Sequence, residues 1–276
     1  YNDAPNVGPL DDFGIYNQVT VGDGIGAANS AKLTIGKNEA GGPNDYANLF
    51  AAGVNVTVNR DGRFDTQGHT HYVQNLTLDG GSVRANNTTN TGGALFVTGN
   101  IASTSTTQTA TIDGLIDLNG TAAKSVNTAA GSTLDINARV QNGGIQKTGT
   151  GTLILSGANT YTGTTNITAG LVRVDNNLGL GATAGATLVQ TGAQLQLDTV
   201  AIGAEALTLN GSGIGGSGAL RTGAGSGANS WAGNITLGAN AEIEVSSASS
   251  LLLSGTVTGS GRTLTVDGPG NATLSG

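Results

Sequence analysis

The chain has 276 residues, and Gly (47), Thr (38), Asn (27) and Ser (18) make up almost half of them. This composition argues against a helical protein, because all four are poor helix-interior residues. The absence of Cys excludes a disulfide scaffold, a thiol enzyme and a zinc–cysteine site. A net charge of −7 argues against binding to nucleic acid or to an anionic membrane surface, which are both negatively charged. The long uncharged stretches are too polar for direct membrane insertion.

The first 72 residues differ in composition from residues 73–276, and we treat the two segments separately. Seven of the ten aromatic residues and three of the four prolines lie before residue 73. Two interpretations stay open for residues 1–72. They form an irregular cap, or less regular opening coils, at the start of a repetitive structure, or they form a docking surface for a partner or the next subunit.

A five-residue pattern recurs through the rest of the chain: an aliphatic residue, any residue, an aliphatic residue, a small polar residue and Gly. Each copy predicts a short strand with two inward side chains, ended by a turn in which Gly is free to take a positive φ. The copies lie at 76–80, 95–99, 116–120, 153–157, 207–211, 251–255 and 264–268.

The spacing of the copies favours a solenoid. The glycines Gly80, Gly99 and Gly120 are 19 and 21 residues apart, and later intervals fit a loose period of about twenty with insertions. A β-sandwich or barrel is the competing all-β fold. Strands this short, repeated over two hundred residues, favour parallel coils about 4.8 Å apart with stacked Asn ladders. We expect the pattern strands to stack in one sheet.

One segment, 144–174, carries the most specific motif of the chain. It reads Lys-x-Gly-x-Gly-Thr-Leu from Lys147, then Leu-Ser-Gly-Ala-Asn-Thr-Tyr-Thr-Gly from Leu155, and ends in Ala-Gly-Leu-Val-Arg-Val at Val174. The segment closely resembles the passenger-associated β-strand repeat of bacterial autotransporters. The resemblance implies a right-handed parallel β-helix that belongs to a secreted passenger, located outside the cell or on the outer surface of a Gram-negative bacterium.

Strand patterning within this segment predicts which side chains are buried. We expect Leu153, Leu155, Ile167, Leu171 and Val174 to face inward. We expect Thr152, Thr164, Thr165 and Thr168 to face outward.

Residues that could carry chemistry are few. No serine-protease motif occurs, and the only histidines are His69 and His71. Their two imidazoles could offer a metal two ligands on one side of a strand, with Asp65 nearby. We interpret this stretch as a solvated strand. The match to a dinucleotide-binding glycine motif at 211–216 is not followed by a helix pattern, so we reject that function.

The carboxylates offer the main alternative. Asp61 and Asp65, and likewise Asp113 and Asp117, are four residues apart and could share a face, as polysaccharide-cleaving enzymes on this fold require. We interpret them as lone surface carboxylates that keep the protein soluble. The positions of Asp113, Asp117 and Asp135 relative to one another are the observation that distinguishes the two functions. We therefore predict no catalytic, cofactor-binding or metal-binding residues and no cofactor.

The sequence predicts an extracellular structural or adhesive module that forms part of a surface-displayed or filament-forming protein. The alternative is a polysaccharide-acting lyase or hydrolase on a parallel β-helix. The expected partners are further copies of the chain, end to end or side by side, and glycans or host and neighbouring cell surfaces. End-to-end association is expected to involve residues 1–13 and the last coil, which has unpaired backbone groups.

Overall fold

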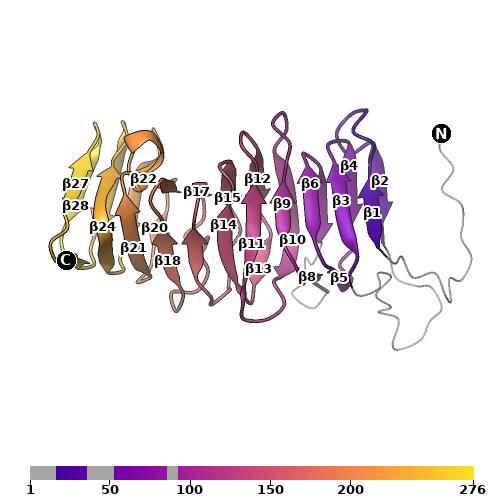
Figure 1. Cartoon of the computed structure of the whole chain (residues 1–276), viewed down its shortest axis with the longest axis horizontal. Helices are drawn as coiled ribbons and strands as arrows, with labels where there is room; N and C mark the ends of the chain where they lie inside the picture. The colour runs from indigo at the N-terminus through magenta and orange to yellow at the C-terminus, as the bar shows by residue number, and fades with distance from the viewer. Residues whose placement is uncertain (1–16, 36–52, 86–92) are drawn as a thin grey trace, which may run out of the picture.

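The structure, a computed structural model, describes residues 17–35, 53–85 and 93–276. These residues form a rod in which the chain advances coil by coil from one end to the other (Figure 1). The described part consists of strands and turns, apart from the single 3-10 turn η1 (Ile214–Gly216). The predicted all-β parallel β-helix is confirmed.

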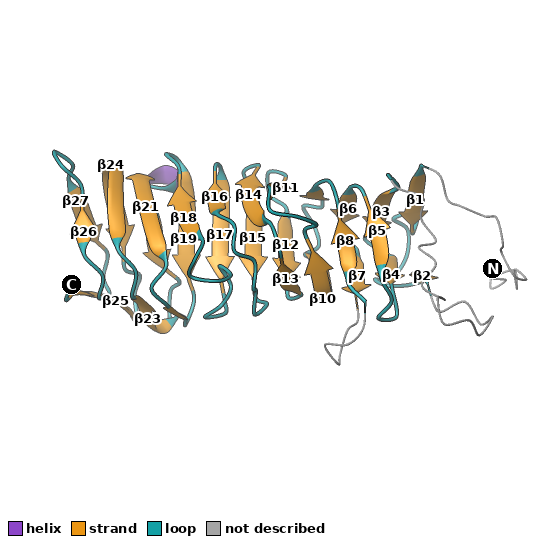
Figure 2. Cartoon of the chain, turned by 90° about the horizontal axis from the view of Figure 1, so that it is seen from below, coloured by secondary structure: helices purple, strands orange, loops and turns teal. Residues whose placement is uncertain are grey.

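The strands stack in three rows that run along the rod, and all pairings between named strands are parallel (Figure 2). Row one contains β1 (Gln18–Val21), β3 (Asn55–Asn59), β6 (Leu76–Asp79), β9 (Ile101–Ser103), β11 (Ala123–Thr128), β14 (Gly144–Thr148), β16 (Thr165–Ile167), β18 (Ala186–Val189), β21 (Ala206–Gly211), the first half of β24 (Ile235–Glu244) and β26 (Val257–Thr258).

Row two contains β2 (Ala31–Thr34), β4 (Gly62–Asp65), β7 (Ser82–Ala85), the first half of β10 (Ala110–Asp117), β12 (Thr133–Ile136), β15 (Thr152–Leu155), β17 (Gly170–Val174), β19 (Ala193–Leu197), β22 (Leu220–Thr222), the second half of β24 and β27 (Leu264–Asp267). Row three has β5 (His71–Val73), β8 (Leu95–Val97), the end of β10 and β13 (Arg139–Gln141), and further along the rod β20 (Ala201–Ile202), β23 (Gly227–Trp231), β25 (Ser249–Leu253) and β28 (Asn271–Leu274).

The core consists of aliphatic columns, because alternate side chains of each strand point into the rod and stack on the same position of the next coil. One column in row two runs through Leu134, Leu153, Val172, Leu195, Leu220 and Ile243, all of them buried. Each member packs between the coil before and the coil after, so stability is a sum of neighbour contacts rather than the property of one central core. The inward positions predicted for Leu153, Leu155, Ile167 and Val174 are confirmed.

Two positions in the same segment differ from the prediction. Leu171 is half-buried, and Val172 takes the inward position because the strand restarts at Gly170, which has φ +71° and is itself buried. Thr165, expected to face outward, is buried, because its hydroxyl lies 2.7 Å from the hydroxyl of the buried Tyr161. Thr164 is exposed, as predicted.

The expectation that the pattern strands stack in one sheet is wrong. The copies at 76–80 and 207–211 lie in row one, and those at 153–157 and 264–268 lie in row two. The copies at 95–99, 116–120 and 251–255 lie in row three. The pattern marks the place where a strand enters a turn, and such places occur in all three rows. Coil length is nevertheless close to the expected period, since Val58 stacks on Leu78 and Lys147 on Ile167.

The described residues before position 73 belong to the same rows. Strands β1 and β3 pair in row one, and β2 and β4 pair in row two. The expected Asn ladder lies at the turn that enters row one, where Asn75 donates to the side chain of Asn55 at 2.8 Å and accepts from the backbone N–H of Asn100 at 2.8 Å. Residues 1–16 and 36–52, and with them most of the aromatic residues of this segment, lie outside the described residues.

Replacement of Leu155 tests the core columns. Leu155 is fully buried between Ile136 and Val174, so Leu155→Asp places a carboxylate without a partner among aliphatic side chains. We expect the free energy of unfolding to fall by about 4 kcal/mol. Thr164→Asp, at an exposed position, is the matched control and should change it by less than about 0.5 kcal/mol. Equal losses in chemical denaturation would contradict the inward assignment.

Candidate functional surfaces

The three carboxylates that could have formed a catalytic group are distributed over two faces of the rod. Asp113 and Asp135 lie in row two, on adjacent coils. Asp117 lies in row three, because β10 bends at Gly114, which has φ +99°, before it continues to residue 117. A straight strand would have placed Asp113 and Asp117 on one face, and this bend separates them.

Each of these carboxylates is hydrogen-bonded to polar groups of the protein. Asp117 is buried and accepts from the backbone N–H of Asn119 at 2.8 Å and from the amides of Gln141 and Asn142 at 2.8 and 2.7 Å. The interpretation of Asp117 as a surface carboxylate is therefore wrong: its oxygens join two coils and a turn.

The two row-two carboxylates have amide and hydroxyl partners. Asp113 accepts from the amide of Asn137 at 2.9 Å, and Asp135 accepts from the hydroxyl of Ser156 at 2.6 Å. Burial raises the pKa of Asp135, and the neighbouring carboxylates of Asp175 and Asp113 act in the same direction.

The residues considered for a metal site, and the neighbouring Asp61, are buried or are bound to other groups of the protein. Asp65 is buried and pairs with Arg63 at 2.8 Å and with Lys32 at 3.7 Å. His71 is buried rather than solvated, and burial lowers its pKa to about 4. Asp61, also buried, accepts from the backbone N–H of Gly24 at 2.8 Å, so the interpretation of Asp61 and Asp65 as lone surface carboxylates is wrong as well. Over the three described stretches, no three His, Asp or Glu side chains gather as metal ligands would.

Charge is segregated on the outer surface. The outward positions in or directly after the row-two strands form what we term the charged face, which carries Lys32, Arg63, Arg84, Asp113, Asp135, Arg173, Asp175, Asp198, Arg221, Glu244 and Asp267. The outward positions of row one between Ser125 and Thr258 form what we term the neutral face. It carries no charged residue and presents Ser125, Asn127, Gln146, Thr148, Asn166, Thr168, Leu188, Gln190, Thr208, Asn210, Thr236 and Thr258.

The side chains of each face interact along the rod axis. On the charged face, Arg173 lies 4.0 Å from Asp198 on the next coil, and Arg221 lies 3.7 Å from Glu244 on the next coil. On the neutral face, the hydroxyls of Ser125 and Thr148 lie 3.2 Å apart across two coils. Axial contacts of this kind hold the outward side chains in regular ladders.

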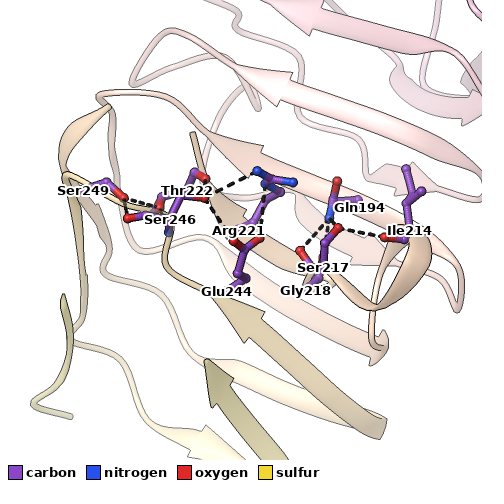
Figure 3. A network of polar contacts seen from close by, with 9 residues as sticks. All are labelled: Gln194, Ile214, Ser217, Gly218, Arg221, Thr222, Glu244, Ser246 and Ser249. Carbon is purple, nitrogen blue, oxygen red and sulfur yellow. Dashed lines mark hydrogen bonds and ion pairs between the residues drawn. The ribbon is translucent and has the colours of Figure 1, made fainter. Parts of the chain in front are cut away.

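Figure 3 shows two groups of polar contacts on row two, one around Thr222 and Ser246 and one between Gln194 and the loop that contains η1. The hydroxyls of Thr222 and Ser249 lie 2.5 Å apart, and Ser246 donates its backbone N–H to Thr222 at 2.9 Å and its hydroxyl to the Thr222 carbonyl at 2.7 Å. Nearby, Gln194 donates to the carbonyls of Ser217 and Gly218, both at 2.8 Å. These bonds tie three coils together, and the Ser246 hydroxyl also lies 3.3 Å from the Glu244 carboxylate (Figure 3).

Lys147 has a structural role that its place in the sequence motif did not reveal. Its side chain is fully buried, and Nζ donates to the backbone carbonyls of Thr148, Gly149 and Ala169 at 3.0, 2.7 and 3.0 Å. Burial lowers the pKa of Lys147 to about 8. A Cβ on Gly170 would lie 2.8 Å from Nζ, so the Gly of the Ala-Gly pair leaves room for the ammonium group.

Asn159 and Tyr161 of the motif fill the third side of the rod where it has no strand. Asn159 accepts from the backbone N–H of Val140 at 2.8 Å and donates to the carbonyl of Gly179 at 2.6 Å, so one buried amide bridges three coils. The fully buried Tyr161 ring packs against Gly181. A Cβ at that position would lie 2.9 Å from the ring, so a side chain there would collide with it. The motif residues Lys147, Asn159 and Tyr161 therefore maintain the coil and do not form a surface site.

Lys147→Met tests this role. The substitution keeps the aliphatic part of the side chain and removes the donor to three carbonyls, so we expect the free energy of unfolding to fall by about 2 kcal/mol. Gln146→Met, at the exposed neighbouring position, introduces the same residue and should have little effect. An unchanged denaturation midpoint for Lys147→Met would show that the three carbonyls do not depend on Nζ.

Comparison with known proteins agrees with this account of the motif. Residues 145–174 match the family model of the passenger-associated-transport-repeat. No curated protein and no solved structure matches the chain. Among the described residues there is no helix with the length and apolar character needed to cross a membrane. The chain therefore carries a passenger-associated-transport repeat within a β-solenoid, the arrangement of an autotransporter passenger-type module.

Proposed function

We propose that the chain is a structural and adhesive module, displayed outside the cell or on its outer surface, and that the neutral face is its contact surface. The observation that carries the proposal is the separation of the two faces. From Ser125 to Thr258, one side of the rod offers hydroxyls and amides without a single charge, while the adjacent side carries most of the charged residues.

The neutral face suits partners that present hydroxyls or amides at regular intervals. Its ladders repeat every coil, about 4.8 Å, and the side chains that form them are held in place by axial contacts. Charged residues are depleted from the centres of protein interfaces, so an uncharged strip is the side on which two chains of net charge −7 repel each other least. Side-by-side contact with a second copy and contact with polysaccharide hydroxyls both fit this chemistry.

The alternative function, cleavage of a polysaccharide, requires carboxylates that converge on one groove. Asp117 lies on a different face from Asp113 and Asp135, and each carboxylate has amide or hydroxyl partners. This arrangement supports a module without catalytic residues. End-to-end association through residues 1–13 stays a prediction, because those residues lie outside the described part of the chain.

A matched pair of substitutions tests the neutral face. Gln146→Glu adds a negative charge to the neutral face, and Gln196→Glu adds the same charge to the charged face, where Gln196 stacks between Arg173 and Arg221. Binding to a panel of immobilised polysaccharides and self-association by light scattering would be measured for both variants and the parent. We expect Gln146→Glu to weaken whichever interaction the parent shows by several-fold, and Gln196→Glu to leave it unchanged.

The outcomes that count against the proposal are specific. A parent chain that binds no polysaccharide of the panel and does not self-associate would contradict an adhesive role. Equal losses in the two variants would show that contact does not occur through the neutral face. Release of reducing sugar or unsaturated product from any polysaccharide by the parent would favour the enzymatic alternative.

A further inference from the structure

From the β14 coil to the β26 coil, one corner of the rod has a glycine in five of six coils. The register of row one places five glycines at the same position of their coils, two residues before the start of the strand pairing. They are Gly143, Gly163, Gly185, Gly233 and Gly255, which precede Ile145, Thr165, Thr187, Ile235 and Val257. We term this column the glycine corner. A Cβ on Gly163, Gly233 or Gly255 would overlap a backbone carbonyl of the coil before it. Coils approach too closely here for a side chain.

Glu205 is the exception in this column. Thr187 stacks on Leu207, which stacks on Ile235, so Glu205 occupies the corner position between Gly185 and Gly233. The chain accommodates its Cβ through a tight local turn, in which the Glu205 N–H donates to the carbonyl of Gly203 at 2.8 Å. The corner position is therefore occupied by an ionisable residue in this coil and by glycine in the coils on both sides.

The carboxyl group of Glu205 is enclosed on both sides. The residue is 2 % exposed, and its Oε1 accepts from the hydroxyl of the buried Thr187 at 2.6 Å. On the other side, the indole N–H of the buried Trp231 donates to the Glu205 backbone carbonyl at 2.9 Å. Glu205 thus connects the coil below, through its side chain, to the coil above, through its backbone.

The surroundings of the carboxyl group contain no compensating cation. Across the described residues, none of the Lys, Arg or His side chains forms an ion pair with Glu205. The titratable group that faces it is the phenol of Tyr161, whose pKa is raised by burial and also by the Glu205 charge, and which stays neutral at physiological pH. An ionised Glu205 would rely on the Thr187 hydroxyl, which is too little to offset the loss of water around a carboxylate.

We propose that the junction between the Thr187 coil and the Trp231 coil is a pH-sensitive opening point of the rod, controlled by the ionisation of Glu205. Protonated, the side chain is a neutral acid that fits the enclosed site. The ionised side chain is stabilised by moving toward water. This movement separates the Glu205 coil from its neighbours and breaks the hydrogen bond between the Glu205 carbonyl and Trp231. Among the corner residues aligned from β14 to β26, Glu205 is the one ionisable residue, since the other five are glycines.

The direction of the effect follows from the protonation of the two states. Burial raises the pKa of Glu205 from 4.5 in the unfolded chain to about 7 in the folded chain. The stability contributed by this site is therefore fully present below pH 4.5 and is lost as the pH rises to about 7. Over that window the equilibrium constant for opening the junction should increase by as much as about 100-fold.

Trp231, the only tryptophan of the chain, is a natural probe at the site. Hydrogen exchange of the β18, β20, β21 and β23 amides, expressed as protection factors to remove the intrinsic pH dependence, and acrylamide quenching of Trp231 would be measured from pH 4.5 to 8.5. We expect protection to fall and quenching to rise with pH in the parent chain, while amides of the distant β6 and β9 keep their protection.

Two variants make the test decisive. Glu205→Gln retains the acceptor for Thr187 without the charge, and Glu205→Gly restores the residue of the glycine corner, so both should lose the pH dependence even if one of them folds poorly. Glu244→Gln, which removes a carboxylate of the charged face, should respond as the parent does. A parent without pH dependence at the junction, or Glu205 variants with the parent's response, would overturn the proposal.

Discussion

The close axial stacking of identical backbone positions is the constraint on which the rest of this structure depends. Each strand pairs in parallel with the strand one coil before and one coil after, at a separation of about 4.8 Å. A side chain therefore always meets the side chains at the same position in two other coils. Columns of like residues are the direct consequence, whether aliphatic inside the rod, Asn at a turn, Gly at a corner or Thr on the surface.

The same constraint explains why buried polar side chains are frequent in a rod with a thin core. Turns between the rows leave backbone carbonyls and amides that no strand ladder satisfies, and burial without a partner would cost free energy at each one. Lys147, Asn159 and Gln194 each donate to carbonyls at such turns. Their polar groups serve the backbone of adjacent coils, which is why motif residues that look reactive in the sequence have no access to a substrate.

The sequence predicted those features that depend on local chain properties. Short strands, a period of about twenty residues and the inward position of Leu153 and Leu155 follow from alternation and turn residues alone. It did not predict which row a strand joins, because the same five-residue pattern ends strands in all three rows. The predicted sides of Thr165 and Leu171 are wrong for two different reasons. For Leu171, strand alternation restarts at the preceding turn. For Thr165, the hydroxyl of Tyr161 on the third side of the rod is a buried partner.

The candidate site was less accessible to sequence analysis, because faces are assembled from residues of many coils. The neutral face is invisible in the sequence as a segment: its members are about twenty residues apart and alternate with buried aliphatics and with charged residues of row two. Separation of charge onto one side is possible because every described coil contributes one strand to row one and one to row two. Stability rests on the inward columns and the axial ladders, so the outward positions of a row are free to differ in character from those of its neighbour. An elongated chain built in this way can keep a charged side toward water and still leave an adjacent uncharged side along the coils from Ser125 to Thr258.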